Sequence, residues 1–176
     1  AAQVTPSFSS SGLSGESSNN PTSLEFGPDG RLYVSQQNGI IYAYTVVRNG
    51  PNDYQVTDTE QINLIKNNTP NHNDDGSSNS TTNRQVTGLV TAGTGTNPML
   101  YVSSSDWRIA VGNDSGLDTN SGVISRLTCT GGIANGECQG WEKVDIVRGL
   151  PRSEENHSTN GMDIDETNNI MYVMSG

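Results

Sequence analysis

The chain has 176 residues and a formal net charge of −10, with nine basic against 19 acidic side chains. Nucleic-acid binding needs clustered Lys and Arg to neutralise phosphates, so this balance argues against a nucleic-acid partner. Only 31% of the residues are hydrophobic and no apolar run approaches the length that crosses a bilayer, so we expect no membrane span. Short Val, Ile, Tyr and Thr runs lie between Gly, Asn, Asp and Ser residues, which predicts an all-β fold of strands joined by turns.

Residues 1–19 are rich in Ser and Gly and carry little apolar surface, which predicts an N-terminal linker or edge segment. Strand patterns fill residues 20–176, which we expect to form the β domain. The first three predicted strands lie at 22–26, 31–35 and 40–46. Between the last two, Asn38-Gly39 is typical of a type I′ hairpin turn. Three consecutive strands with tight turns predict an antiparallel meander.

The strand pattern recurs along the chain. A Tyr-Val pair stands at 33–34, 101–102 and 172–173, about 70 residues apart each time. Repetition of a small antiparallel sheet is typical of a β-propeller with four-stranded blades, and the long period places the extra residues in polar loops. About two and a half repeats cannot close a ring. We therefore expect the remaining blades to come from sequence beyond residue 176 or from another chain.

The repeat also predicts which side chains are buried between stacked sheets. These are the aliphatic and aromatic residues on one face of each strand: Leu24, Phe26, Leu32, Val34, Leu89, Leu100, Val102, Met162, Ile164, Met171 and Val173. Asp163 and Asp165 alternate with two of them and should point away from any site. The polar loop at 67–83 should stay exposed.

That loop contains a candidate metal site. Asn71, Asn73 and Asp75 place oxygen ligands at alternate positions before Gly76, as calcium-binding loops do. The place of the usual bidentate glutamate is taken by Thr82. A solvated polar loop without bound metal is the alternative interpretation.

The two cysteines, Cys129 and Cys138, flank a stretch with three glycines. Such a stretch can fold back on itself, which predicts a disulfide across a hairpin loop between strands at 123–128 and 141–147. A disulfide indicates an oxidising compartment. We therefore expect a secreted protein, either extracellular or periplasmic.

His157 is one of only two histidines and lies between turn-forming residues and a predicted strand. An imidazole at such a junction can accept a proton near neutral pH, which makes His157 a candidate general base. A surface histidine that hydrogen-bonds its own loop is the alternative.

Three blocks of the sequence, at 20–34, 84–89 and 149–158, resemble the soluble pyrroloquinoline-quinone-dependent sugar dehydrogenases, the glucose/sorbosone dehydrogenase family. The first block is similar to the opening blade of these six-bladed propellers. The second, Arg84-Gln85-Val86-Thr87-Gly88-Leu89, is similar to a segment in which a glutamine approaches cofactor and substrate. The third, which contains His157, is similar to the segment with the catalytic histidine.

The resemblance implies a role for each matching residue. His157 would be the base that takes the proton of the anomeric hydroxyl, and Gln85 would hydrogen-bond substrate and cofactor. Asn156 would join this binding site, although the family usually has an acidic residue there. The aspartate that orients the imidazole would fall just beyond Gly176. Pyrroloquinoline quinone and calcium are the implied cofactors.

Two functions follow as hypotheses. The first is a secreted sugar dehydrogenase that oxidises an aldose at its anomeric carbon with a quinone cofactor. The alternative is a non-catalytic extracellular propeller for glycan binding, adhesion or structural assembly, with calcium or no cofactor. Both hypotheses make a carbohydrate the expected small-molecule partner.

Overall fold

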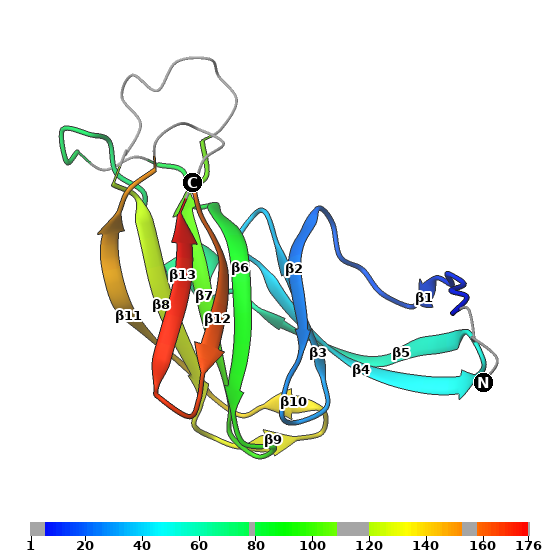
Figure 1. Ribbon diagram of the computed structural model, residues 1–176. Coiled ribbons are helices and arrows are strands. Elements are labelled where there is room, and N and C mark those ends of the chain that lie inside the picture. The colour runs from blue at the N-terminus through cyan, green and yellow to red at the C-terminus, as the bar shows by residue number, and fades with distance from the viewer. Residues whose placement is uncertain (1–5, 78–79, 109–119, 153–157, 176) are drawn as a thin grey trace, which may run out of the picture.

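The computed structural model describes residues 6–77, 80–108, 120–152 and 158–175. These residues form several antiparallel sheets and one short helix, so the all-β prediction is confirmed (Figure 1). Within the same residues, no helix has the length and apolarity needed to cross a membrane.

The first sheet is a meander of four sequential antiparallel strands. They are β2 (Pro21–Phe26), β3 (Leu32–Gln36), β4 (Ile41–Gly50) and β5 (Asp53–Ile62), and the helix α1 (Leu64–Asn68) follows them. A fifth, two-residue strand, β1 (Leu13–Ser14), pairs in parallel with β5. Residues 13–14 thus lie at the edge of this sheet, and Ser17 N–H also donates to the Tyr44 hydroxyl at 3.2 Å.

The predicted type I′ turn at Asn38-Gly39 is wrong. Gly39 has a positive φ, but Asn38 does not, and the Asn38 side-chain Oδ1 accepts the N–H of Ile40 at 3.1 Å. Gly39 N–H donates to Gln36 O, and Gln36 N–H donates to Ile40 O. This is a type I turn followed by a left-handed glycine, the usual three-residue hairpin loop.

The second sheet has the same sequential order. Its strands are β6 (Arg84–Gly93), β7 (Pro98–Asp106), β8 (Gly122–Cys129) and β11 (Trp141–Leu150). The small hairpin of β9 (Ile133–Ala134) and β10 (Glu137–Cys138) is inserted between β8 and β11, and its turn residues Asn135 and Gly136 both have positive φ. Cys129 and Cys138 form a disulfide, so both this bond and the strand pair that it closes are confirmed.

The third sheet has two described strands, β12 (Thr159–Asp165) and β13 (Ile170–Ser175), and β12 lies against β6. Gly88 permits this approach, since a Cβ there would lie 2.3 Å from Asn160 O. Ser103 Oγ fixes the same contact by donating to Asn160 O at 2.9 Å. The first sheet is joined to β6 as well, because Glu25 of β2 accepts the N–H of Thr91 at 2.8 Å.

The main core lies between the first and second sheets. It is a cluster of fully buried side chains: Tyr33, Ile41, Ala43, Ile62, Ile65, Val86, Leu89, Leu100, Val102 and Leu127. A smaller cluster on the other face of the first sheet contains Val34, Tyr44 and Val56.

The burial prediction is confirmed for some residues and wrong for others. Confirmed as buried are Val34, Leu89, Leu100 and Val102, and half-buried are Leu32, Met162, Ile164 and Met171. Exposed instead are Leu24 (63%), Phe26 (59%) and Val173 (37%). Leu24 and Phe26 pair with Val34 and Leu32, on the face of the first sheet that points away from the second sheet. Val173 lies on the edge strand β13, which pairs only with β12 in the described part of the chain.

Candidate functional site

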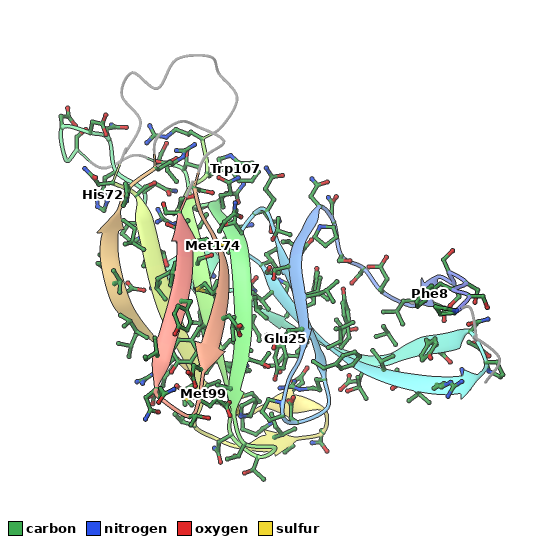
Figure 2. All side chains as sticks on the ribbon, in the orientation of Figure 1. Phe8, Glu25, His72, Met99, Trp107 and Met174 are labelled. Carbon is green, nitrogen blue, oxygen red and sulfur yellow. A yellow bond between two sulfur atoms is a disulfide. The ribbon has the colours of Figure 1, made fainter. Side chains whose placement is uncertain are left out.

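Two long polar loops begin or end at one end of the second sheet. Here β6 starts, β7 ends and β12 starts, so we call it the Gln85 end (Figure 1, top). His72 and Trp107 mark it in Figure 2. The opposite end, at the bottom of the figures, carries the β9–β10 hairpin and is called the disulfide end.

Arg84 holds the loops of the Gln85 end together. Its side chain is almost fully buried, and its guanidinium donates to Asn71 Oδ1 at 3.0 Å and to Ser104 O at 3.3 Å. It also donates to the backbone carbonyl of Ser121. A planar guanidinium with five N–H donors can satisfy several carbonyls at once, which a lysine could not. Arg84 is therefore a structural residue, a role that its place in the block resembling the family did not indicate.

A second arginine performs a similar role outside the strands. Arg108 forms an ion pair with the fully buried Asp106, with Nη2 and Oδ2 2.5 Å apart. The same guanidinium donates to Asn73 Oδ1 at 2.7 Å and to His72 O at 2.6 Å. These contacts tie the loop after β7 to the loop before β6.

The candidate calcium ligands are already used in these contacts. Asn71 Oδ1 accepts from Arg84 and Asn73 Oδ1 accepts from Arg108, so a cationic group occupies both oxygens. The Asp75 carboxylate is exposed, and hydrogen bonds from Ser77 lower its pKa. Asn71 is also buried, contrary to the prediction of an exposed loop, because its amide donates to two backbone carbonyls. In the described ranges, no group of three or more His, Cys, Asp or Glu side chains could hold a metal. Calcium binding stays a prediction.

Gln85 differs from its neighbours because its carbonyl is buried without a partner. The residue is 9% exposed, and Oε1 has no hydrogen-bond partner among the described residues. Its cross-strand partner on β7 is Ser105, whose fully buried Oγ is also without a partner there. Buried polar groups are nearly always paired, and leaving one unpaired costs about 1–3 kcal/mol. Both residues therefore remain able to bind a group that the described structure does not supply.

His157 and Asn156 lie outside the described residues. The structure does describe Ser158 and Thr159, which directly follow them and are buried. The carbonyl of Thr159 accepts a hydrogen bond from Thr87 Oγ1. Thr87 follows Gln85 by two positions and Thr159 follows His157 by two positions. The chain on the C-terminal side of His157 is thus attached at the Gln85 end.

Sequence reasoning missed Ser105 and Thr159, whose buried hydroxyls have no partner in the described structure. A signal was present for Ser105. The run Ser103-Ser104-Ser105-Asp106 continues an apolar strand without a turn residue, and all four side chains are buried. A fully buried polar run is unusual and marks a place where the hydrogen bonds need to be accounted for.

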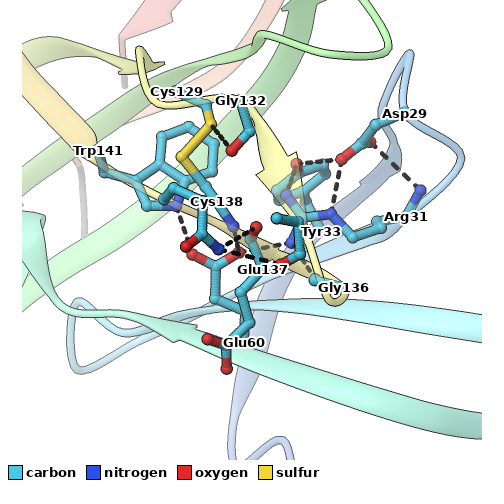
Figure 3. Close-up of polar contacts among 12 residues, drawn as sticks. Asp29, Arg31, Tyr33, Glu60, Cys129, Gly132, Gly136, Glu137, Cys138 and Trp141 are labelled. Atoms are coloured by element: carbon cyan, nitrogen blue, oxygen red, sulfur yellow. Dashed lines mark hydrogen bonds and ion pairs between the residues drawn. A yellow bond between two sulfur atoms is a disulfide. The ribbon is translucent and has the colours of Figure 1, made fainter.

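The disulfide end also has a buried polar cluster, which Figure 3 shows in close-up. Arg31 donates to Asp29 Oδ2 at 2.6 Å, to Glu60 Oε2 at 2.5 Å and to Gly136 O at 2.9 Å. Glu60 also accepts from Trp141 Nε1 at 2.6 Å and from Cys138 N–H at 3.1 Å. This cluster joins the first sheet to the disulfide hairpin and to β11.

The groups of this cluster satisfy one another. Tyr33 accepts from Arg31 and donates to Asp29 Oδ2, both at 2.8 Å, and burial raises the pKa of its hydroxyl. Burial alone would lower the pKa of Arg31, but hydrogen bonds to Asp29 and Glu60 outweigh it and the pKa is raised. A closed network of this kind stabilises the fold. Unpaired hydroxyl and amide groups, and hence the better candidate for a binding site, are at the Gln85 end.

A comparison with known protein families gave no match, and no curated protein matches the chain in sequence. The similarity to the sugar dehydrogenases therefore rests on the three sequence blocks alone.

Proposed function

We propose that the chain is part of a secreted β-propeller that binds a carbohydrate at the Gln85 end and oxidises it at the anomeric carbon. One observation carries the proposal: the Gln85 carbonyl is buried and unpaired in the described structure, at the position that the family resemblance assigns to substrate binding. The Cys129–Cys138 disulfide is compatible with secretion.

The arrangement of the sheets supports the propeller. Two sheets each contain four sequential antiparallel strands, which is the order of a propeller blade. Their first strands, β2 and β6, contact each other, and β6 contacts the first strand of the third sheet, β12. In a propeller the first strands of successive blades lie side by side around the axis in this way.

The chemistry of Gln85 suits a sugar. A primary amide offers one acceptor and two donors, and a sugar hydroxyl can act as either, so one amide can bind neighbouring hydroxyls. Gln85 would hold the sugar, and His157 would accept the proton of its anomeric hydroxyl.

The described residues fit the cofactor less well than the sugar. Pyrroloquinoline quinone would supply the hydride acceptor, and its carboxylates need cationic partners. Arg84 and Arg108 at this end donate to protein groups instead. The described residues therefore support sugar binding, and cations for the cofactor would have to come from outside them.

The test measures two properties of the full-length protein. Isothermal titration with a panel of neutral aldoses measures binding, and dye reduction with added pyrroloquinoline quinone and calcium measures oxidation. We expect Gln85→Ala to weaken binding and His157→Ala to abolish oxidation while the far-ultraviolet circular dichroism stays unchanged. If the wild-type protein binds none of the aldoses, the proposal is wrong.

A second function, assembly without catalysis, is favoured by the apolar outer faces of the sheets. Leu24 (63%) and Phe26 (59%) are exposed on the first sheet, and Tyr172 (57%) and Met174 (68%) are exposed on β13. Contiguous apolar surface on a sheet usually marks contact with another layer. Sugar binding without oxidation, together with association through these faces, would favour this second function.

A further inference from the structure

Buried hydroxyl and amide oxygens without a partner are few in the described structure. They belong to Thr69, Gln85, Ser105 and Thr159, and the last three lie at the Gln85 end. We infer that Ser105 and Thr159 complete the binding site of Gln85 and make it selective for a neutral, hydroxyl-rich ligand. This inference rests on the proposed carbohydrate-binding function and names two further binding residues and the class of sugar.

The register of the second sheet brings the first two residues together. Gln85 and Ser105 are directly opposite each other on β6 and β7, so both side chains leave the same face of the sheet, with Cβ atoms about 4.5–5.5 Å apart. Ser103 lies two residues before Ser105 and so shares this face, and its Oγ contacts Asn160 O of β12. The face is therefore the one that β12 covers.

Thr159 reaches the same place from β12. Its backbone carbonyl accepts from Thr87 Oγ1, on the strand that carries Gln85. Its side chain points toward β8, since a Cβ added to Gly122 would lie 2.6 Å from Thr159 Oγ1. Two hydroxyls and one amide thus lie on strands at the Gln85 end, and their three oxygens have no partner in the described part of the chain.

The nearby charges decide which ligand fits. Arg84 donates to protein groups, as described above, and Arg108 neutralises Asp106. Arg152 donates to the carbonyl of Arg108. The three unpaired groups themselves are uncharged, so they offer no counter-charge to a ligand carboxylate or phosphate. Such a site should bind a neutral sugar better than a uronic acid or a sugar phosphate.

The unpaired hydroxyls also predict an unusual effect on stability. Removing a buried hydroxyl that has no partner relieves a desolvation cost, so Ser105→Ala should leave the melting temperature unchanged or raise it by up to about 4 °C. The same change should weaken sugar binding about 3- to 10-fold, because one hydrogen bond to the ligand is lost. We expect Thr159→Val to behave in the same way.

Two variants serve as matched controls. Ser103→Ala removes a paired buried hydroxyl from the same strand, and should lower the melting temperature. Thr69→Val removes an unpaired buried hydroxyl that lies in the loop between α1 and β6 and on none of the three strands, and should leave sugar binding unchanged.

The experiment measures melting temperature and sugar binding for the wild-type protein and the four variants. The ligands are D-glucose, D-galactose and L-arabinose as neutral sugars, and D-glucuronate as the anionic counterpart of glucose. The inference is supported if Ser105→Ala and Thr159→Val weaken binding without loss of stability. It is overturned if they melt at lower temperature as Ser103→Ala does and bind sugar normally, or if D-glucuronate binds as tightly as D-glucose. Absence of binding to the wild-type protein would instead reject the proposed function itself.

Discussion

Single residues determine how closely the sheets approach, and Gly88 is the clearest case. An added Cβ would lie 2.3 Å from Asn160 O and 2.6 Å from Ser103 Oγ, distances that require β12 to move away from β6. The sequence marked this position only as part of a block that resembles a known family. Its physical role depends on a strand about 70 residues further along the chain, which no local pattern can predict.

The glycine can be tested directly. We expect Gly88→Ala to lower the free energy of unfolding by about 1–3 kcal/mol, because overpacking forces backbone shifts. Gly12→Ala is the matched control, since no heavy atom lies within 4 Å of the added Cβ and its φ is not positive. Urea unfolding of both variants measures the difference. Equal stability of the two variants would show that β12 can shift enough to accommodate the added methyl group at no cost.

At the scale of elements, local patterns predicted the strands and the disulfide but not the groups that join them. The alternation of apolar residues and the glycines between the two cysteines are local signals. The Arg31–Glu60 pair and the contact between Arg31 and Gly136 join residues 29 and 105 positions apart. Ser105 was missed for a related reason, because the absence of a partner becomes visible only in the folded sheet. Gln85 was found through the resemblance and not through its environment.

The disulfide hairpin provides the prediction at this scale. Cys129→Ser with Cys138→Ser should lower the free energy of unfolding by about 2–3 kcal/mol, since the denatured chain loses its cross-link. The hairpin also hydrogen-bonds the buried ion pair, because Gly136 O accepts from Arg31 and Cys138 N–H donates to Glu60. Part of the lost stability should therefore come from weakening the Arg31–Glu60 pair.

A double-mutant cycle with Glu60→Gln measures that part. A coupling energy of about 0.5 kcal/mol or more between the cysteine and Glu60 substitutions would support a link between hairpin and ion pair, because the stability losses of mutations within one network do not add. Additive losses would mean that the hairpin and the buried ion pair stabilise the fold independently. Reduction of the wild-type protein in urea is a second measurement of the cysteine effect.

At the scale of the whole molecule, the described sheets form a stack in which the first sheet and β12 cover the two faces of β6 and β7. The strand β11 and the outer layers have apolar residues in contact with solvent. Alternation along β2 placed Leu24 and Phe26 on one face of the strand, and in the structure they pair with Val34 and Leu32. It could not reveal whether another layer covers that face. The same is true of Tyr172 and Met174 on β13. The sequence therefore predicted the type of fold and the faces of its strands, but not which of these faces are left exposed to solvent.

If another antiparallel sheet packs on the face with Leu24 and Phe26, replacing both by Ser should abolish the contact. We expect the wild-type chain to associate, or to bind an apolar dye, and the Leu24→Ser, Phe26→Ser variant to do so much less. The fold should survive, because both side chains are already mostly exposed, whereas truncation of the buried Leu100 should cost about 2–5 kcal/mol.

Val47→Ser is the matched control, since Val47 is 41% exposed on the projecting end of β4. Sedimentation should be measured at low and high salt, because the net charge of −10 opposes self-association most strongly at low ionic strength. A wild-type chain that stays monomeric at both salt concentrations and binds no dye would show that this face is stable in water and needs no partner.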